Sequence, residues 1–174
     1  MQKYERCTEP CASSFIRLCE GNLMTTNMII DSYKEEDTYE YGRRCGMEAR
    51  PGQVYCLYGD LGVGKTVFTK GFAAGLGITE TVSSPTFTIV QIYEDGRIPL
   101  YHFDVYRIGD PEEMFETGFE DYVEGDGVCF IEWAGLIEEI LPDDRIEIRI
   151  EKDLDKGFDY RRITIDTGHD TTGK

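Results

Sequence analysis

A glycine-rich segment in the middle of the chain constrains the fold more than any other feature of the sequence. Residues 59–66 read GDLGVGKT and match the pattern G-x-x-x-x-G-K-[ST] at every fixed position. In such a loop, backbone N–H groups converge on phosphate groups, and the glycines let the phosphates approach. An apolar run precedes the motif and a helix-compatible stretch follows it, which is the context that the motif requires. The motif consists of Gly59, Asp60, Leu61, Gly62, Val63, Gly64, Lys65 and Thr66.

The last two residues of this loop carry the chemistry of a nucleoside triphosphate site. We expect Lys65 to reach the terminal phosphates as a positive charge, and the Thr66 hydroxyl to complete the coordination of Mg²⁺. The helix that begins at Lys65 adds the positive end of its dipole. All eight residues of the loop are therefore predicted to bind the nucleotide, and Lys65 is also predicted to be catalytic.

Sites of this kind also need a carboxylate at the end of a neighbouring strand, where it fixes the Mg²⁺ or a water molecule bound to the ion. The apolar run at residues 128–131 is followed by Glu132. Aspartate is the usual residue here, so the longer glutamate acts either directly or through water. We predict Glu132 as a catalytic residue and metal ligand, and the alternative is an ordinary glutamate at a strand end.

Two further segments are candidates for the same site. In YHFDVYR (residues 101–107), His102 and Asp104 share one face of an extended strand. Asp104 is predicted to be catalytic, by orienting the attacking water or by helping to hold Mg²⁺; the alternative is a His–Asp pair on a solvated face. The segment SSPTFT (residues 83–88) is a candidate switch loop beside the γ-phosphate. Trp133 has two interpretations, a core residue or a contact for a ligand or partner.

Strand and helix patterns alternate along the chain and predict an α/β fold with a mixed sheet. Asp95-Gly96 predicts a hairpin between two strands, and the alternating segments at 145–151 and 160–166 predict a closing antiparallel pair. Gly71 and Gly75 share one face of the helix after the loop, which predicts a close approach to the sheet. The expected architecture is a three-layer P-loop NTPase-like domain with a mostly parallel sheet.

The domain is predicted to span residues 27–168. Residues 1–26 show no apolar period and are expected to form a disordered extension, and residues 169–174 are expected to form a tail. No apolar stretch is long enough to span a bilayer and no signal peptide is visible, so the cytoplasm is the expected location. The cysteines are interpreted as reduced thiols, with a zinc site on Cys7, Cys11 and Cys19 as the alternative.

The formal net charge of −16 opposes direct binding to a polyanion, because lysine and arginine make most contacts to nucleic-acid phosphates. Any nucleic acid is therefore expected to be held by a partner protein. Adjacent basic residues occur only at Arg43-Arg44 and at Arg161-Arg162.

Taken in order, the segments GDLGVGKT, VSSPTF, HFDVYR and IEW resemble the TsaE family of small bacterial P-loop ATPases, over residues 28–166. The resemblance implies weak ATP hydrolysis with Mg²⁺ in the synthesis of threonylcarbamoyladenosine at adenosine 37 of tRNA. The implied partners are the tRNA threonylcarbamoyltransferase and its non-catalytic companion subunit, which form a heterodimer and contact most of the tRNA. By the same resemblance, Thr66 and Glu132 hold Mg²⁺, while Asp104 and Trp133 are functional residues.

Two other functions share the phosphate-binding loop. A small-molecule or nucleoside kinase has the same loop, but it closes an arginine-bearing lid over the phosphates. Between the loop and Glu132 the sequence offers only Arg97 and Arg107. A scaffold that binds ATP without hydrolysing it is the second alternative, and turnover in the presence of partners distinguishes it from an ATPase.

Overall fold

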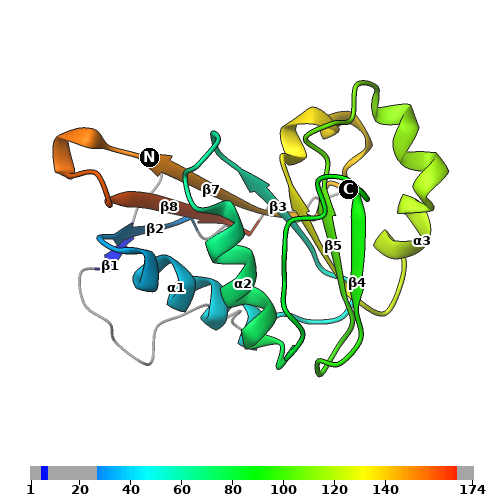
Figure 1. The fold of residues 1–174 in the computed structure, drawn as a ribbon, viewed down its shortest axis with the longest axis horizontal. Coiled ribbons are helices and arrows are strands. Elements are labelled where there is room, and N and C mark those ends of the chain that lie inside the picture. The colour runs from blue at the N-terminus through cyan, green and yellow to red at the C-terminus, as the bar shows by residue number, and fades with distance from the viewer. Residues whose placement is uncertain (1–4, 8–26, 168–174) are drawn as a thin grey trace, which may run out of the picture.

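The computed structural model of the chain describes residues 5–7 and 27–167, which form one eight-stranded sheet with helices on both faces (Figure 1). The order of the strands across the sheet is β1-β2-β8-β7-β3-β6-β5-β4. The strands are β1 (Glu5–Cys7), β2 (Asn27–Ser32), β3 (Val54–Tyr58), β4 (Val90–Tyr93), β5 (Leu100–Asp104), β6 (Val128–Glu132), β7 (Ile146–Lys152) and β8 (Arg161–Asp166).

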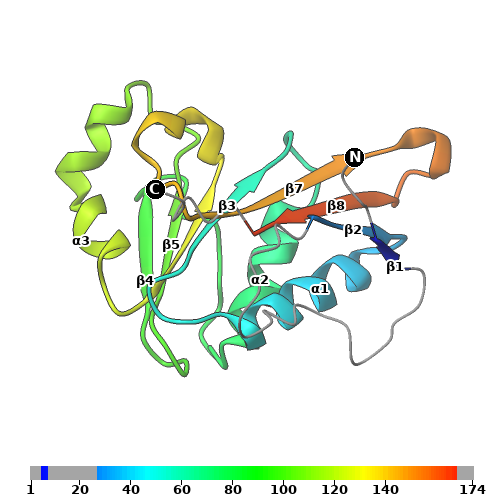
Figure 2. The same cartoon turned by 180° about the vertical axis from the view of Figure 1, so that it is seen from behind.

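Two long helices, α1 (Glu35–Glu48) and α2 (Lys65–Gly75), lie side by side on one face of the sheet, as Figures 1 and 2 show from opposite sides. The remaining helices are short, and most of them join the strands at the other end of the molecule. They are η1 (Pro111–Thr117), α3 (Phe119–Val123), η2 (Ala134–Leu136), η3 (Glu138–Ile140) and η4 (Leu154–Lys156).

The sheet is mixed, as predicted. The central strands β7, β3, β6 and β5 run parallel to one another. β8 pairs antiparallel with both β7 and β2, and β4 pairs antiparallel with β5 across the predicted hairpin. The parallel core places the carboxyl ends of β3, β5 and β6 at one edge, where α/β proteins bind their ligands. The predicted α/β fold with a mixed sheet and an antiparallel C-terminal pair is confirmed.

Side chains that alternate along the central strands fill two separate cores. In β6, Phe130 points toward α1 and α2, and its ring centroid lies 4.7 Å from that of Phe72 in α2. Cys129 and Ile131 point to the opposite face and pack with Met114, Phe119 and other residues of the short helices. Because β6 is buried on both faces, its sequence is a continuous apolar run. This layering gives the predicted three layers.

The close approach predicted from Gly71 and Gly75 exists, but its partner was predicted wrongly. A Cβ atom on Gly71 would lie 2.0 Å from the carbonyl oxygen of Tyr39, and one on Gly75 would lie 2.0 Å from that of Arg43. Tyr39 and Arg43 belong to α1, so the glycines face the neighbouring helix instead of the sheet. Gly42 and Gly46 of α1 meet α2 in the same way. The sequence of the helix shows that the residues on one face are small, but it does not reveal which element packs against that face.

Capping residues mark the start of the first helix between β5 and β6. The Asp110 side chain accepts from the Glu112 N–H, Pro111 follows the cap, and Glu113 completes a capping box. The helix that follows is 3₁₀ rather than α, and so are the turns that end before Pro142. The cap at Asp110 fixes where η1 begins, whereas η2 and η3 have no side-chain cap.

The described thiols are reduced and buried. Cys45, Cys56 and Cys129 are free, and burial raises the pKa of Cys45 and of Cys129 to about 12. The side chains of the three N-terminal cysteines, on which the zinc alternative depends, lie outside the described residues. Of the predicted extension 1–26, only the backbone of residues 5–7 is described, and it pairs in parallel with β2. The prediction for the rest of that segment, and for the tail 169–174, also lies outside the described residues.

Candidate active site

The glycine-rich loop connects β3 to α2 and has a backbone that needs its glycines. Gly59, Gly62 and Gly64 have φ angles of 144°, 71° and 108°, values that side chains with a Cβ rarely adopt. A Cβ atom on Gly59 would also lie 2.5 Å from the carbonyl oxygen of Ile150 in β7. The spacing of the motif is therefore matched by a bend that only glycine allows at these positions.

The loop ends at the amino terminus of α2, which is open on the side of the loop. Gly64 is the N-cap, and no side chain caps the first turn. Backbone N–H groups at the start of a helix have no partner within the helix, and together with the helix dipole they favour a bound anion. The first turn of α2, from Lys65 to Val67, lines a cavity of about 510 Å³ together with Leu61, Gly62, Val63 and Gly64 of the loop. A phosphate group fits this cradle.

Lys65 lies between the loop and Trp133. Its Nζ atom donates to the carbonyl oxygens of Gly59 at 2.7 Å and Asp60 at 2.9 Å, and it lies 3.6 Å from the centroid of the Trp133 ring. Burial lowers the pKa of Lys65 below its ordinary value, while the negative charges of Glu132, Asp104 and Asp60 act in the opposite direction. The cation is thus held at the wall of the cavity on partners that a phosphate can replace.

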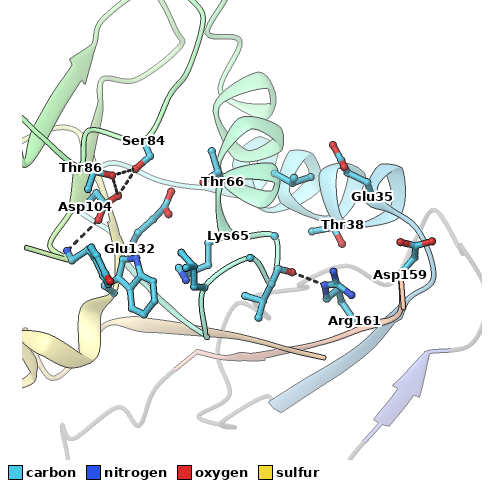
Figure 3. A pocket seen from close by; sticks show the side chains of 17 residues that line it. Glu35, Thr38, Lys65, Thr66, Ser84, Thr86, Asp104, Glu132, Asp159 and Arg161 are labelled. Atoms are coloured by element: carbon cyan, nitrogen blue, oxygen red, sulfur yellow. Dashed lines mark hydrogen bonds between the residues drawn. The ribbon is translucent and has the colours of Figure 1, made fainter. Parts of the chain in front are cut away.

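The two predicted catalytic carboxylates lie beside each other. Asp104 ends β5, Glu132 ends β6, and the two residues are paired in the register of these parallel strands. Both are buried and line the cavity. In Figure 3 the Glu132 carboxylate points toward Thr66, at the start of α2. The carboxyl ends of neighbouring parallel strands have brought together residues that are 28 positions apart in the chain.

Two side chains, Thr69 and His102, form hydrogen bonds with the Glu132 carboxylate. Neither contact was predicted from the sequence. The Oε1 atom of Glu132 lies 2.9 Å from Thr69 Oγ1, one helical turn after Lys65, and 3.0 Å from His102 Nε2 in β5. Sequence reasoning paired His102 with Asp104 instead of with Glu132. The two-residue period of β5 and β6 was the available signal, since it places His102, Phe130 and Glu132 on one face of the sheet.

Asp104 organises the predicted switch loop. Its Oδ2 atom accepts hydrogen bonds from Ser84 Oγ and, at 2.7 Å, from Thr86 Oγ1, as the dashed lines of Figure 3 show. Its Oδ1 atom accepts from the backbone N–H of Tyr106 at 3.1 Å. Ser84 and Thr86 themselves line the cavity. The segment 83–88 therefore contributes Ser84 and Thr86 to the cavity wall, and Asp104 connects it to the sheet.

Trp133 lines the cavity and also packs against the core on the side of the short helices. The side chain is only partly buried, and it lines both this cavity and a neighbouring one of about 450 Å³ on the other side of the loop. The residue has a φ angle of 65°, and its ring centroid lies 4.8 Å from that of Tyr106. Its backbone N–H donates to the carbonyl of Leu57 at the end of β3. A non-glycine residue held in this conformation marks a site where the surrounding structure imposes the geometry.

The opposite end of the cavity is formed by α1 and the start of β8. Arg161 donates from Nε to the carbonyl of Val63 at 2.7 Å, and so ties β8 to the loop. Glu35, Thr38 and Asp159 complete this end (Figure 3). The sequence singled out Arg161 only as half of a basic pair, because nothing in its local pattern reveals a contact with residues almost a hundred positions earlier.

Nearly all predicted site residues meet in one cavity. Asp104, Glu132, Trp133 and the loop from Leu61 to Thr66 all line it. Gly59 and Asp60 do not; they line the neighbouring cavity and turn their carbonyl oxygens to Lys65. These two residues therefore shape the loop and hold Lys65 in place.

The donors around Thr66 are suited to Mg²⁺ bound with a nucleotide. Within residues 27–167, His, Cys, Asp and Glu form no group of three or more that would hold a metal ion on their own. Mg²⁺ at nucleotide sites takes only one or two protein oxygens and completes its shell with phosphates and water. The Thr66 hydroxyl and the Glu132 carboxylate, which points toward it, are donors of that kind.

Comparison with known proteins identifies the family. The model of the family described as "Threonylcarbamoyl adenosine biosynthesis protein TsaE" matches residues 32–163. The chain belongs to the TsaE family.

Relatives and a solved structure agree with this assignment. The chain is 53% identical over 130 residues to the TsaE protein of Bacillus subtilis, a match covering 75% of this chain and 79% of the relative. It is 43% identical over 134 residues to that of Treponema pallidum, covering 77% and 96% of the two chains. The crystal structure of Bacillus subtilis YdiB superposes with a TM-score of 0.71 at 44% identity, covering 84% of this chain and 89% of that one.

The family assignment carries a role in the biosynthesis of threonylcarbamoyladenosine on tRNA, and this matches the role implied by the resemblance. In the part of the chain that the structure describes, no helix combines the length and the apolar character needed to cross a membrane.

Proposed function

We propose that this TsaE family member binds ATP with Mg²⁺ in the cavity around residues 61–67 and hydrolyses it slowly, in support of threonylcarbamoyl transfer to adenosine 37 of tRNA. One observation carries the proposal: the glycine-dependent bend of the loop opens directly onto the uncapped first turn of α2, with two strand-end carboxylates facing it. A loop of this shape next to a pair of carboxylates is suited to a phosphate chain and its counterion.

The residues of the cavity divide into binding and catalytic roles. The N–H groups of the loop and of the first turn of α2 hold the phosphates, and Lys65 leaves its carbonyl partners to neutralise the terminal ones. Thr66 and Glu132 hold Mg²⁺, which when bound neutralises charge on the β- and γ-phosphates. Asp104 orients the attacking water while it keeps Ser84 and Thr86 in place. Trp133 closes the phosphate end of the cavity.

The slow turnover proposed for the isolated chain is expected to rise in a complex. We propose that the partners are the tRNA threonylcarbamoyltransferase and its non-catalytic companion subunit, which form a heterodimer and carry most contacts to tRNA. The net charge of −16 supports this division of labour, since it disfavours contact between this chain and the phosphates of tRNA. We propose that the protein acts in the cytoplasm, in keeping with a role in tRNA modification together with these partners.

The two arginines between the loop and Glu132 give no support to the kinase alternative. Arg97 donates to the carbonyl oxygens of Gly46 and Ala49 at the end of α1, at 2.6 Å each. Arg107 lies over the exposed ring of Phe87, 4.2 Å from its centroid. Neither arginine lines the nucleotide cavity. These two arginines therefore do not form a lid over the cavity.

Lys65→Ala tests the proposal. The change removes the cation at the phosphate end of the cavity, so we expect ATP affinity or ATP turnover to fall at least tenfold with the melting temperature little changed, because a charged contact to a phosphate is worth about 1.5–3 kcal/mol. Binding is measured by calorimetry, and turnover is measured with and without the partner heterodimer. Lys70→Ala is the matched control, since Lys70 is exposed on the same helix. A folded Lys65→Ala protein with unchanged binding and turnover would falsify the proposed site.

A further inference from the structure

His102 occupies a position where a hydrocarbon side chain would be expected. It lies in the middle of β5, is fully buried, and stands edge-on to the ring of Phe130 at a centroid distance of 6.4 Å. Its register neighbours are Phe130 in β6 and Gln91 in β4. A polar ring in such surroundings is unfavourable unless its nitrogen atoms are hydrogen-bonded. Its presence therefore needs a reason other than packing.

Among the described residues, only one of the two ring nitrogens has a hydrogen-bond partner. His102 Nε2 lies 3.0 Å from Glu132 Oε1, whereas Nδ1 is buried without a hydrogen bond to any described residue. A carboxylate oxygen accepts and does not donate, so Nε2 is the donor in this hydrogen bond. The ring thus tolerates an unsatisfied Nδ1 while Nε2 donates to Glu132. The hydrogen bond to Glu132 is therefore the one polar contact with a described residue that accounts for a histidine at this buried position.

The second group near Glu132 Oε1 cannot replace this bond. Thr69 Oγ1 lies 2.9 Å from Glu132 Oε1 and also 2.9 Å from the carbonyl oxygen of Lys65. A hydroxyl has a single proton to donate. The Thr69 proton is therefore shared between two acceptors, or given to one of them. The N–H of His102 is the donor that serves Glu132 alone.

The consequence for Glu132 is a fixed direction. With Oε1 held by His102 and Thr69, the other oxygen is left toward the cavity, on the side of Thr66 (Figure 3). A glutamate side chain has three rotatable bonds and is longer than the aspartate usual at this position, so its orientation is not set by its backbone alone. An N–H donor behind the carboxylate supplies the missing restraint.

We infer that His102 is a positioning residue that orients Glu132 toward the Mg²⁺ of the bound nucleotide. This inference rests on the proposed function. Partners one step behind a metal ligand orient the ligand, and their loss costs about 10–100-fold in metal affinity. His102 does not contact the cavity itself. Its effect is therefore expected on the dependence of nucleotide binding on Mg²⁺, and not on nucleotide binding as such.

The test compares the affinity for ADP in excess Mg²⁺ with the affinity in excess EDTA, by calorimetry on the full chain. His102→Leu removes the donor, and His102→Gln keeps an N–H donor at about the position of Nε2. We expect the gain in ADP affinity from Mg²⁺ to fall about tenfold in His102→Leu and to stay within about threefold of the original protein in His102→Gln. The affinity measured in EDTA is expected to be the same in all three proteins. Glu132→Gln, which removes the carboxylate, marks the largest loss.

The outcomes separate the inference from the proposed function. If the unmodified protein binds no ADP, or binds it equally well with and without Mg²⁺, the proposed function fails and the inference fails with it. If the unmodified protein shows the gain and His102→Leu keeps it, only the inference is overturned. Loss of the gain in a folded His102→Gln protein would also overturn it, because the donor would then be irrelevant. This last comparison decides the question even if His102→Leu does not fold.

Discussion

Trp133 links the cavity around residues 61–67 to the surface on the other side of the loop. Its ring contacts the Lys65 ammonium on one side and Tyr106 on another, and it is a wall of both cavities. A cation over an aromatic ring contributes about 0.5–2 kcal/mol. In the proposed ATP complex Lys65 would turn to a phosphate and this contact would be lost, so the environment of Trp133 would depend on whether ATP is bound. This is a physical route by which a bound nucleotide can be sensed at the surface.

Replacement of Trp133 by alanine separates its two interpretations. Truncating a fully buried tryptophan costs roughly 3–5 kcal/mol. Because Trp133 is only partly buried, we expect a smaller loss of about 1–2 kcal/mol in urea denaturation. We also expect partner-stimulated ATP turnover and tRNA threonylcarbamoylation to fall clearly below those of the unmodified protein.

Leu136→Ala is the matched control for Trp133→Ala, since Leu136 is exposed and lines only the second cavity. A loss of 3 kcal/mol or more with turnover unchanged would return Trp133 to the core, by the same roughly 3–5 kcal/mol scale.

Most secondary-structure elements could be predicted, because each has a local cause. The apolar runs at β3 and β6, the hairpin glycine, the capping box at Asp110 and the glycine-rich loop all act over a few residues. The positions of Lys65, Glu132 and Asp104 in one cavity followed from the rule that parallel strands end at the same edge. What could not be predicted depends on contacts between distant segments. The packing of α2 on α1, the bond from Arg161 to Val63 and the bond from His102 to Glu132 are of this kind.

The crossing of α1 and α2 makes a prediction that opposes helix propensity. Alanine is favoured over glycine in a helix by about 1 kcal/mol. At Gly71, however, the added Cβ would lie 2.0 Å from a backbone carbonyl oxygen of α1, which has little freedom to move. Overpacking typically costs about 1–3 kcal/mol, and we expect Gly71→Ala to lower the free energy of unfolding by about 2 kcal/mol in urea denaturation.

Lys70→Ala, next to this position and exposed, is the control and is expected to change the stability by less than about 0.5 kcal/mol. A Gly71→Ala protein more stable than the original would show that the helices do not meet at this glycine.

The charge of the molecule is unevenly distributed along the chain. The segment from residue 108 to residue 144 contains no lysine, arginine or histidine, and it includes η1, α3, β6, η2 and η3. Exposed acidic residues in this segment include Glu112, Glu116, Glu120, Asp121, Glu124 and Asp126. Lys65 and Arg161, the cations that line the cavity around residues 61–67, are engaged with carbonyl oxygens of the chain. The acidic end of the molecule therefore repels phosphates, and the basic residues of the cavity are suited to one small ligand.

This distribution predicts that the isolated chain does not hold tRNA. Proteins that bind nucleic acid without specificity do so through lysine and arginine, with Kd values of about 10⁻⁴–10⁻⁶ M at physiological salt. With a net charge of −16, the chain is expected to bind tRNA more weakly than this range, both with and without ATP. The measurement is fluorescence anisotropy of labelled tRNA at physiological salt, with the proposed partner heterodimer alone as the positive control. A micromolar Kd that weakens steeply as salt is added would contradict the prediction, because it would reveal a phosphate-binding surface on this chain. The tRNA would then have to be assigned to this chain as well as to its partners.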